Sequence, residues 1–142
     1  MQAVTTKTLK PAEQIQHALA HFFVGMLLSD PDLSETEMKK IDIIIYKMRH
    51  GLPGKHELMM DVFKHMRHDD TAMALSPEYH LNRGLELLDS YAAAGLLKDV
   101  HLEALMDLLD VIAEVGEVTE EEELYLQQAR QAFNDRAEGY IG

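Results

Sequence analysis

The chain has 142 residues, of which 25 are acidic and 13 are lysine or arginine, and its formal net charge is −12 with histidine counted as neutral. This length suffices for one domain with a buried core, and the absence of cysteine excludes disulfides, thiolate metal ligands and cysteine nucleophiles. The acidic balance argues against nucleic acid and anionic membrane as partners, because both require a basic surface. It favours cations or a protein partner with a basic surface.

Targeting and membrane segments are not expected. Residues 1–8 lack the apolar core of a signal peptide, and the longest apolar runs are about seven residues, far short of the ~18–20 that span a bilayer. Apolar residues recur at spacings of three and four, whereas strand alternation is missing. The sequence therefore predicts a soluble, all-α protein, and the absence of cysteine is compatible with the cytosol. We expect one domain over residues 1–142, a bundle of six or seven helices, with residues 1–10 and 137–142 frayed.

Proline, glycine and capping residues bound the first three predicted helices. One helix is predicted from near Pro11 to Leu28, with proline in its first turn. A second is predicted from after Ser34 to Gly51, where Leu52-Pro53-Gly54 forbids continuation. A third should run from about Lys55 to His68, followed by a break or a short turn at Asp69-Asp70-Thr71. One apolar stripe of the first helix is expected to face the core: Ile15, Leu19, Phe22, Phe23, Met26 and Leu27.

Three more helices are predicted in the second half of the chain. Ser76 and Pro77 are the N-cap and first-turn proline of a helix that should stop in the Ala92–Gly95 region. The next should run from about Val100 to Val115, and the last follows Thr119 and fades near Asn134. No linker rich in proline, glycine or serine divides the chain, so these helices are expected to share one core.

A short acidic phrase occurs twice, 85 residues apart. The copies are Ser29-Asp30-Pro31-Asp32-Leu33-Ser34-Glu35-Thr36-Glu37 and Glu114-Val115-Gly116-Glu117-Val118-Thr119-Glu120-Glu121-Glu122. Each follows an apolar run and precedes a segment with helical spacing. The bundle is therefore predicted to contain two pseudo-symmetric helix–acidic turn–helix hairpins.

The acidic turns carry enough carboxylates to bind a hard divalent cation, which needs several oxygen ligands on a short, bent backbone. An EF-hand is excluded, because position 6 counted from Asp30 is Glu35 rather than glycine, and position 12 is Ile41 rather than glutamate. The candidate ligands for Ca²⁺, Mg²⁺, Mn²⁺ or Zn²⁺ are Asp30, Asp32, Glu37, Glu114, Glu117 and Glu122.

Helix capping is the competing interpretation for two of these residues. Ser34-x-x-Glu37 and Thr119-x-x-Glu122 both match a capping box, in which the hydroxyl and the glutamate satisfy backbone amides reciprocally. The four acids that precede the caps are not explained in this way and are the stronger ligand candidates: Asp30, Asp32, Glu114 and Glu117.

The last third of the chain is the most acidic part. Residues 101–142 hold 11 of the acidic residues against only Arg130 and Arg136. Four of the acids, at i, i+4, i+7 and i+11, form one stripe on a predicted helix: Glu103, Asp107, Asp110 and Glu114. Two interpretations stay open for this interaction face, an ordinary solvated surface or a surface that binds a cation or the arginines of a partner.

The eight histidines form no recognisable catalytic or metal motif. His56-Glu57 lacks the second histidine of a zincin helix, because the fifth residue is Met60, and the Glu-x-x-His of ferritin-like sites does not occur. His17 and His21 share one helix face, and a second face carries Glu57, Asp61, His65 and His68. Both faces lie opposite apolar stripes, so ordinary surface placement is expected. Phosphate loops and nucleophile elbows are also missing, and an enzyme is not expected.

The histidines give the sequence an expected response to mild acid. Unperturbed histidine titrates near ~6.5, so protonation of all eight would reduce the −12 charge to −4. Self-association or partner release is therefore expected to change around pH ~6, whereas cation affinity should hold until the carboxylates titrate near ~4.

The two phrases together resemble the repeated phrase of the TerB-like tellurite-resistance family, roughly Ala-Asp-Gly-x-(Val/Ile)-(Ser/Thr)-x-x-Glu between helices. The first copy has Pro31 where the family has glycine, and matches through Asp30, Leu33, Ser34 and Glu37. The second has Val115 where the family has aspartate, and matches through Gly116, Val118, Thr119 and Glu122. The resemblance implies an acidic, cytoplasmic helical bundle linked to stress and metal-related complexes, without established enzyme activity. It also implies divalent-cation binding at Asp30, Glu37, Gly116 and Glu122.

Two functions follow as hypotheses. In the first, the protein is a non-catalytic, cation-binding module in a tellurite or stress-resistance context. In the second, it is an interaction scaffold whose acidic face at residues 101–123 docks a basic protein partner, without metal. Assembly into a homodimer is compatible with either hypothesis.

Overall fold

The computed structural model describes residues 10–29, 39, 40, 43, 56–114 and 119–136. These residues form six helices and no strand, so the predicted all-α class is confirmed. The helices are α1 (Pro11–Leu28), α3 (His56–Arg67), α4 (Asp70–Met73), α5 (Pro77–Ala93), α6 (Asp99–Ala113) and α7 (Glu120–Arg136). Lys39, Lys40 and Ile43 are also helical, within the stretch predicted as the second helix, whose other residues lie outside the described part.

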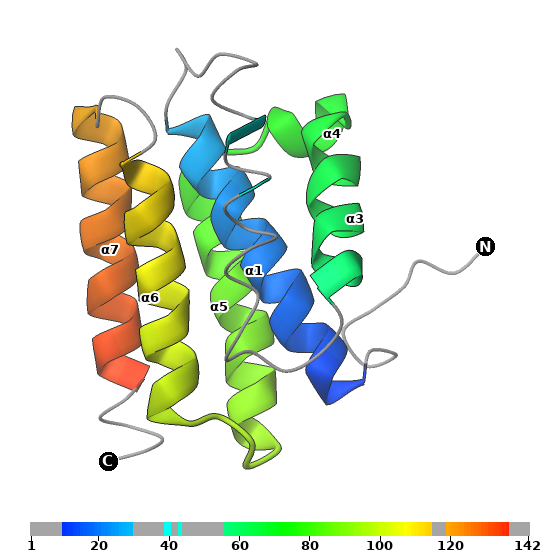
Figure 1. Cartoon of the computed structure of the whole chain (residues 1–142), viewed down its shortest axis with the longest axis vertical. Helices are drawn as coiled ribbons and strands as arrows, with labels where there is room; N and C mark the ends of the chain where they lie inside the picture. The colour runs from blue at the N-terminus through cyan, green and yellow to red at the C-terminus, as the bar shows by residue number, and fades with distance from the viewer. Residues whose placement is uncertain (1–9, 30–38, 41–42, 44–55, 115–118, 137–142) are drawn as a thin grey trace.

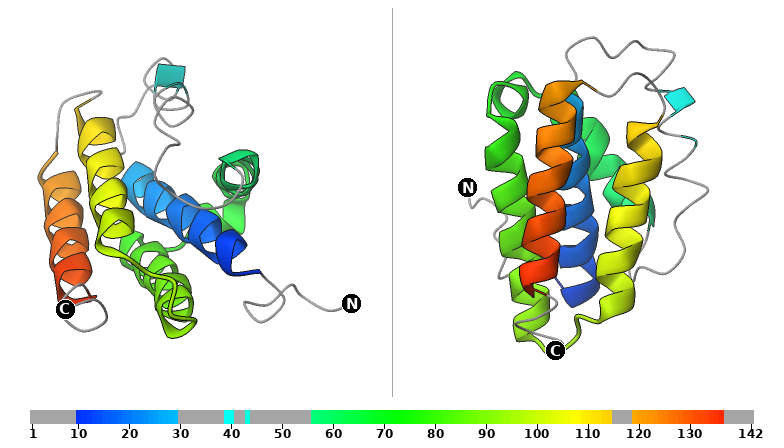
Figure 2. Two further views of the ribbon diagram at one scale, coloured as in Figure 1. Left: turned by 60° about the horizontal axis from the view of Figure 1, so that its bottom comes forward. Right: turned by 90° about the vertical axis from the view of Figure 1, so that its left-hand side faces the viewer.

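Helix α1 is the centre of the bundle. It contacts α3, α5, α6 and α7, with α3 on one side and α6 and α7 on the other (Figure 1). Helices α1, α3 and α6 run in one direction, and α5 and α7 run in the opposite direction. Seen from the side of α7, that helix lies between α5 and α6 with α1 behind it (Figure 2).

The central position of α1 makes it buried on most sides. From Gln14 to Met26, every residue except His17 and His21 is buried. The sequence predicted one inward stripe, and five of its six residues are buried, while Leu27 is half-buried. The prediction did not include the other faces, where Ala18, Ala20 and Val24 are enclosed as well. A helix surrounded by neighbours needs apolar residues all round.

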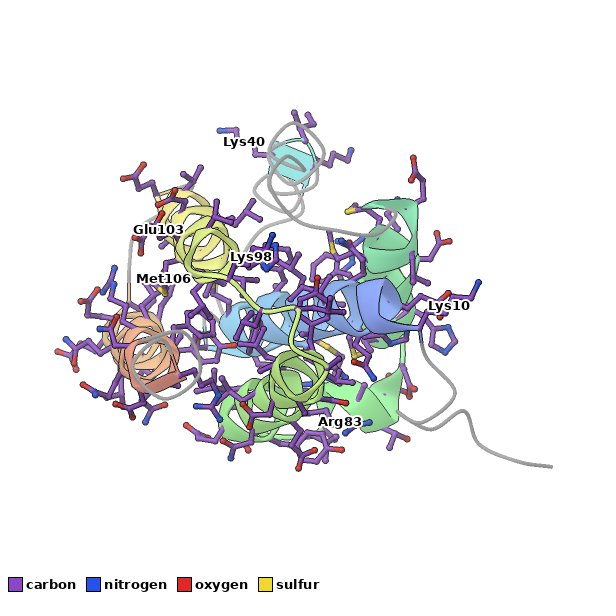
Figure 3. All side chains as sticks on the ribbon, turned by 90° about the horizontal axis from the view of Figure 1, so that it is seen from below. Lys10, Lys40, Arg83, Lys98, Glu103 and Met106 are labelled. Atoms are coloured by element: carbon purple, nitrogen blue, oxygen red, sulfur yellow. The ribbon has the colours of Figure 1, made fainter. Side chains whose placement is uncertain are left out.

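Two glycines let neighbouring helices approach α1 closely. A Cβ atom on Gly84 of α5 would lie 2.5 Å from Cε1 of Phe22. A Cβ atom on Gly25 of α1 would lie 2.6 Å from the hydroxyl oxygen of Tyr125 on α7. The Phe22 ring of α1 also packs edge-to-face on the Phe133 ring of α7, with ring centroids 5.2 Å apart. Side chains from the surrounding helices fill the space around α1 (Figure 3).

Local sequence signals explain the boundaries of the shorter elements. The Ser76 hydroxyl accepts a 3.1 Å hydrogen bond from the Tyr79 N–H and caps α5. Helix α5 ends before Gly95, whose φ of 78° is the left-handed conformation that favours glycine. The predicted break after α3 contains one turn of helix, α4, because Asp69 caps it by accepting from the Thr71 N–H at 2.9 Å.

Candidate functional site

One residue of each acidic phrase takes part in a hydrogen bond at one end of the bundle. The Thr119 hydroxyl donates a 3.0 Å hydrogen bond to the carbonyl oxygen of Ser29, 90 residues away in the chain. Ser29 is the first residue of the first phrase, and Thr119 is the hydroxyl residue of the second. The C-terminal ends of α1 and α6 and the start of α7 lie at this same end of the molecule (Figure 1). The fold therefore joins the first residue of one phrase to the hydroxyl residue of another that is distant in sequence.

Both residues of this hydrogen bond are fixed by helix termini. Ser29 is buried and follows α1; its N–H bonds to the carbonyl of Gly25 at 3.1 Å, and its hydroxyl donates to Met26 at 2.7 Å. Thr119 precedes α7, and its hydroxyl oxygen accepts the Glu122 N–H at 3.0 Å. The threonine half of the predicted capping box is thus confirmed. The Thr119 hydroxyl serves as an acceptor within α7 and as a donor to Ser29.

The predicted metal ligands fall into two groups. Four of them, Asp30, Asp32, Glu37 and Glu117, lie outside the described residues. Glu114 is exposed just beyond the end of α6, whereas Glu122 is 5% exposed in the first turn of α7. Among the described residues, no group of three or more histidine, aspartate or glutamate side chains is arranged to hold a metal ion. The six-residue ligand set therefore stays a prediction.

The predicted acidic stripe lies on α6 and on Glu114 just beyond it, but one of its members is paired. Glu103, Asp107 and Glu114 are exposed, and Glu103 lies on the side of α6 facing away from α1 (Figure 3). Asp110 is half-buried and accepts a 2.6 Å hydrogen bond from Arg130 of α7. Helical spacing predicted the stripe correctly, and it could not predict a cation supplied by the facing helix.

The second arginine of this acidic third is also paired. Arg136, near the end of α7, makes two hydrogen bonds to the carboxylate of Asp89 on α5, at 2.7 and 3.0 Å. A two-point contact between guanidinium and carboxylate fixes the orientation of both groups. Arg130 and Arg136 thus join α7 to α6 and α5, respectively.

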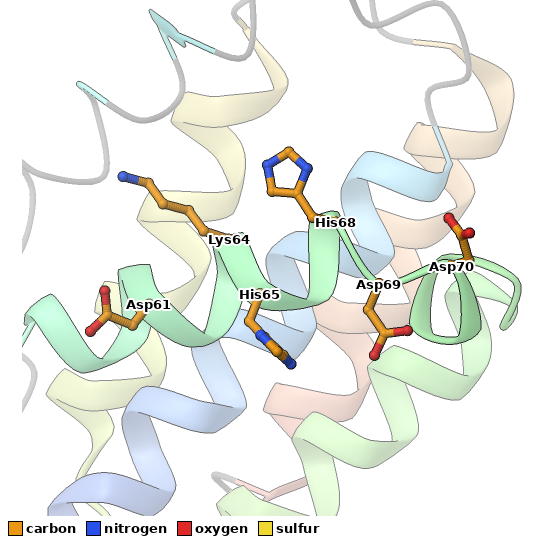
Figure 4. Close-up of a pocket in the computed structure, with 6 residues that line it drawn as sticks. All are labelled: Asp61, Lys64, His65, His68, Asp69 and Asp70. Atoms are coloured by element: carbon orange, nitrogen blue, oxygen red, sulfur yellow. The ribbon is translucent and has the colours of Figure 1, made fainter.

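A shallow pocket lies beside α3 and α4, and its lining is polar and charged: Asp61, Lys64, His65, His68, Asp69 and Asp70. Three of these residues belong to the helix face that the sequence grouped together. Their side chains point in different directions rather than toward one point (Figure 4). Asp69 is moreover engaged in capping α4. The pocket presents separate polar groups to solvent rather than a ligand cluster.

A pair of histidines was missed by sequence reasoning. His80 is 1% exposed in the first turns of α5, and its Nδ1 lies 3.1 Å from Nδ1 of His21 on α1. The rings are stacked with centroids 5.3 Å apart. The His80 Nε2 atom lies 2.9 Å from the carbonyl oxygen of Ala72 in α4. The prediction of ordinary surface placement is wrong for His21, which is half-buried because the His80 ring of α5 packs against it.

These contacts limit how the two rings can be protonated. A carbonyl oxygen can only accept, so His80 carries a proton on Nε2. When His80 is neutral, its Nδ1 has a lone pair and His21 donates its Nδ1–H to it. Burial, followed by the charges of His80, Arg83 and His17, lowers the pKa of His21 to about 3. The expectation that every histidine titrates near its ordinary value is therefore wrong for His21.

Comparisons with protein-family models, curated proteins and solved structures found no match. The resemblance to the TerB-like family thus depends on the two acidic phrases and their places in the chain. None of the described helices is long and apolar enough to cross a bilayer.

Proposed function

We propose that this chain is a non-catalytic, TerB-like protein that binds a divalent cation where its two acidic phrases meet. The hydrogen bond from Thr119 to Ser29 carries the proposal, because it holds the first residue of the first phrase against the hydroxyl residue of the second. A single cation can then take oxygen ligands from both phrases. This single shared site replaces the symmetric pair of sites that two copies alone would suggest.

Covalent geometry supports convergence of the ligands. Consecutive Cα atoms lie about 3.8 Å apart, so Asp30 is tethered within that distance of Ser29. Glu117 is two residues before Thr119 and therefore within about 7.6 Å of it. An aspartate and a glutamate side chain on such short tethers can reach one ion. Backbone carbonyls and water would complete the six to eight oxygens that Ca²⁺ takes, or the octahedron that Mg²⁺ requires.

The charge of the chain supports a cation rather than an anion at this end. Four consecutive glutamates, Glu120 to Glu123, form the first turn of α7, and Glu114 is exposed beyond α6. Like charges so close together repel, and a bound divalent cation would relieve that repulsion. Binding would then stabilise the contact between α1 and α7. A cytoplasmic role in tellurite or stress resistance is the context that the resemblance suggests.

Isothermal titration calorimetry of the full chain with Ca²⁺, Mg²⁺, Mn²⁺ and Zn²⁺ tests the proposal. We expect at least one of these ions to bind with a stoichiometry of one ion per chain. Each of the variants Asp30→Asn and Glu117→Gln should weaken that binding at least tenfold. The matched control is Asp61→Asn, which removes an exposed carboxylate on α3 and should leave binding unchanged. The proposal is contradicted if none of the four ions binds, or if Asp61→Asn weakens binding as much as the two ligand variants do.

A second function is favoured by the exposed carboxylates of α6. Glu103, Asp107 and Glu114 are solvent-exposed, which is the condition for docking a basic protein partner by charge complementarity. Charge reversal by Glu103→Lys and Asp107→Lys should abolish capture of such a partner and leave cation titration unaffected. Asp30→Asn should do the reverse. The two sets of variants therefore distinguish the scaffold from the cation module.

A further inference from the structure

The histidine pair joins three helices at one point. His21 belongs to α1, His80 to α5, and the carbonyl oxygen that His80 contacts belongs to Ala72 of α4. Helix α4 has four residues and packs against α3, while Ala72 and Met73 rest half-buried on the hydrophobic core. The hydrogen bond from His80 is thus a direct polar tie between this short helix and α5.

The hydrogen-bond chain requires at least one uncharged ring. His21 donates Nδ1–H to the lone pair of His80, and His80 donates Nε2–H to Ala72. If both rings were protonated, two N–H groups would face each other 3.1 Å apart, and neither could accept. The doubly protonated pair therefore loses its central hydrogen bond and places two positive charges in contact, where burial strengthens their repulsion.

The surroundings of the pair favour the neutral state further. Ionisable groups on the packed elements include His17 and Glu13 on α1, Glu78, Tyr79 and Arg83 on α5, Asp69 and Asp70 at the start of α4, and Arg67 on α3. Of these, Arg83 and His17 act on His21 as positive charges. The Tyr79 ring packs edge-on against the His80 ring, with ring centroids 5.4 Å apart. The Asp69 carboxylate accepts a hydrogen bond from the Thr71 N–H.

We propose that His21 and His80 form a proton-sensitive latch, whose protonation in mild acid releases α4 and the first turns of α5 from α1. The release is local, because the C-terminal half of α5 is held separately by the Arg136–Asp89 contact and by Phe22 packed against Gly84. It exposes the apolar side chain of Met73 and the stacked ring of His80. This inference does not depend on the proposed cation site.

The expected size of the effect follows from linkage between protonation and opening. His21 released to solvent would titrate near ~6.5, whereas burial in the latch lowers its pKa to about 3. The opening equilibrium should then rise about thirtyfold between pH 8 and pH 5 for each histidine that gains a proton on release. The amides of residues 70–80 should report this increase, since they span α4 and the start of α5.

Hydrogen exchange measured by mass spectrometry tests the latch in the full chain with EDTA present, between pH 5 and pH 8. Opening of residues 70–80, corrected for intrinsic exchange, should increase about thirtyfold toward pH 5, while residues 124–133 of α7 change much less. The double variant His21→Gln/His80→Gln should show no such pH dependence. The control His65→Gln/His68→Gln replaces two exposed histidines, one in α3 and one just after it, and it should behave as wild type.

Three results would overturn the latch. The first is a pH-independent opening of residues 70–80, or an equal increase in α7, since either would separate the opening from the pair. The second comes from ¹⁵N spectra of wild-type histidines at pH 7.5, which need no variant to fold. We expect a proton on Nδ1 of His21 and on Nε2 of His80, and any other assignment contradicts the mechanism. Protection that appears only with added Zn²⁺ would likewise assign the two nitrogens to a metal instead.

Discussion

The hydroxyl of Tyr125 donates a 2.7 Å hydrogen bond to the carbonyl oxygen of Phe22, across 103 residues of sequence. Both groups are buried, and the bond joins the last described helix of the chain to the first. Burial, with a smaller contribution from the charge of Glu78, raises the pKa of Tyr125, so the phenol stays protonated and keeps its donor. Tyr125 therefore positions α7 on α1 just below the Thr119–Ser29 contact.

Tyr125→Phe should lower the free energy of unfolding by about 1 kcal/mol, the usual net contribution of one buried hydrogen bond. The loss is modest because the ring still fills its space beside Gly25. Chemical denaturation should give this value, with an unchanged dependence on denaturant concentration. Tyr79→Phe is the matched control, since Tyr79 is 46% exposed and its hydroxyl should contribute little. If Tyr79→Phe lowered the free energy of unfolding as much as Tyr125→Phe, the hydrogen bond to Phe22 would not be the cause.

Gly25→Ala should be destabilising by about 1–3 kcal/mol, because the new methyl group would overlap the Tyr125 ring. The higher helix propensity of alanine offsets only part of this cost. The cost should shrink when the ring is removed, so a double-mutant cycle with Tyr125→Leu should show positive coupling between the two sites. Strictly additive changes in stability would contradict close packing at this point.

Asp110→Asn should lower stability by less than about 1 kcal/mol, because its ion pair with Arg130 is partly exposed on both sides. The loss should decrease as salt is added. Asp107→Asn on the same helix is the control; it should leave stability unchanged or raise it slightly by reducing repulsion among the acids of α6. Thermal unfolding at low and high ionic strength separates the two variants. An equal effect of both would indicate that Arg130 contributes nothing specific.

Stability should fall as the pH drops below about 6.5, because His21 binds a proton more readily in the unfolded chain. Its pKa is about 3 in the folded protein, against 6.5 for an unperturbed histidine, so the unfolded chain carries the extra proton between these values. The loss should reach about 2 kcal/mol at pH 5 relative to pH 8. Burial lowers the pKa of His17 and His101 in the same direction. Denaturation across pH 5–8 should show a flatter profile for His21→Gln than for the exposed-residue control His65→Gln.

The sequence predicted the helices well, since their boundaries depend on local chemistry. Proline fixed the starts of α1 and α5, Gly95 marked the end of α5, and Thr119 began α7. Helix α4 was not predicted, because a segment of four residues is too short to show helical periodicity. It forms where the Asp69 side chain accepts a hydrogen bond from the Thr71 N–H and caps the turn.

The less predictable features all depend on contacts between distant segments. Nothing near His21 in the sequence indicates His80, which lies 59 residues away. The partner of Asp110 is likewise on another helix. The repeated phrases predicted two acidic turns, but the Ser29–Thr119 hydrogen bond that places their boundaries together required the fold. Local periodicity determines which face of a helix is apolar, and only packing determines how many faces are covered.

The enclosure of α1 constrains the order in which the protein can fold during synthesis. Residues 14–26 are synthesised early, yet the helices that cover them include α5 and α7, at residues 77–93 and 120–136. A nascent chain that has not yet released α7 leaves the Gly25 face of α1 without its partner. Non-local contacts of this kind slow folding and leave apolar surface open to aggregation. Chaperone binding to ribosome-bound chains should therefore persist until the last helix has emerged.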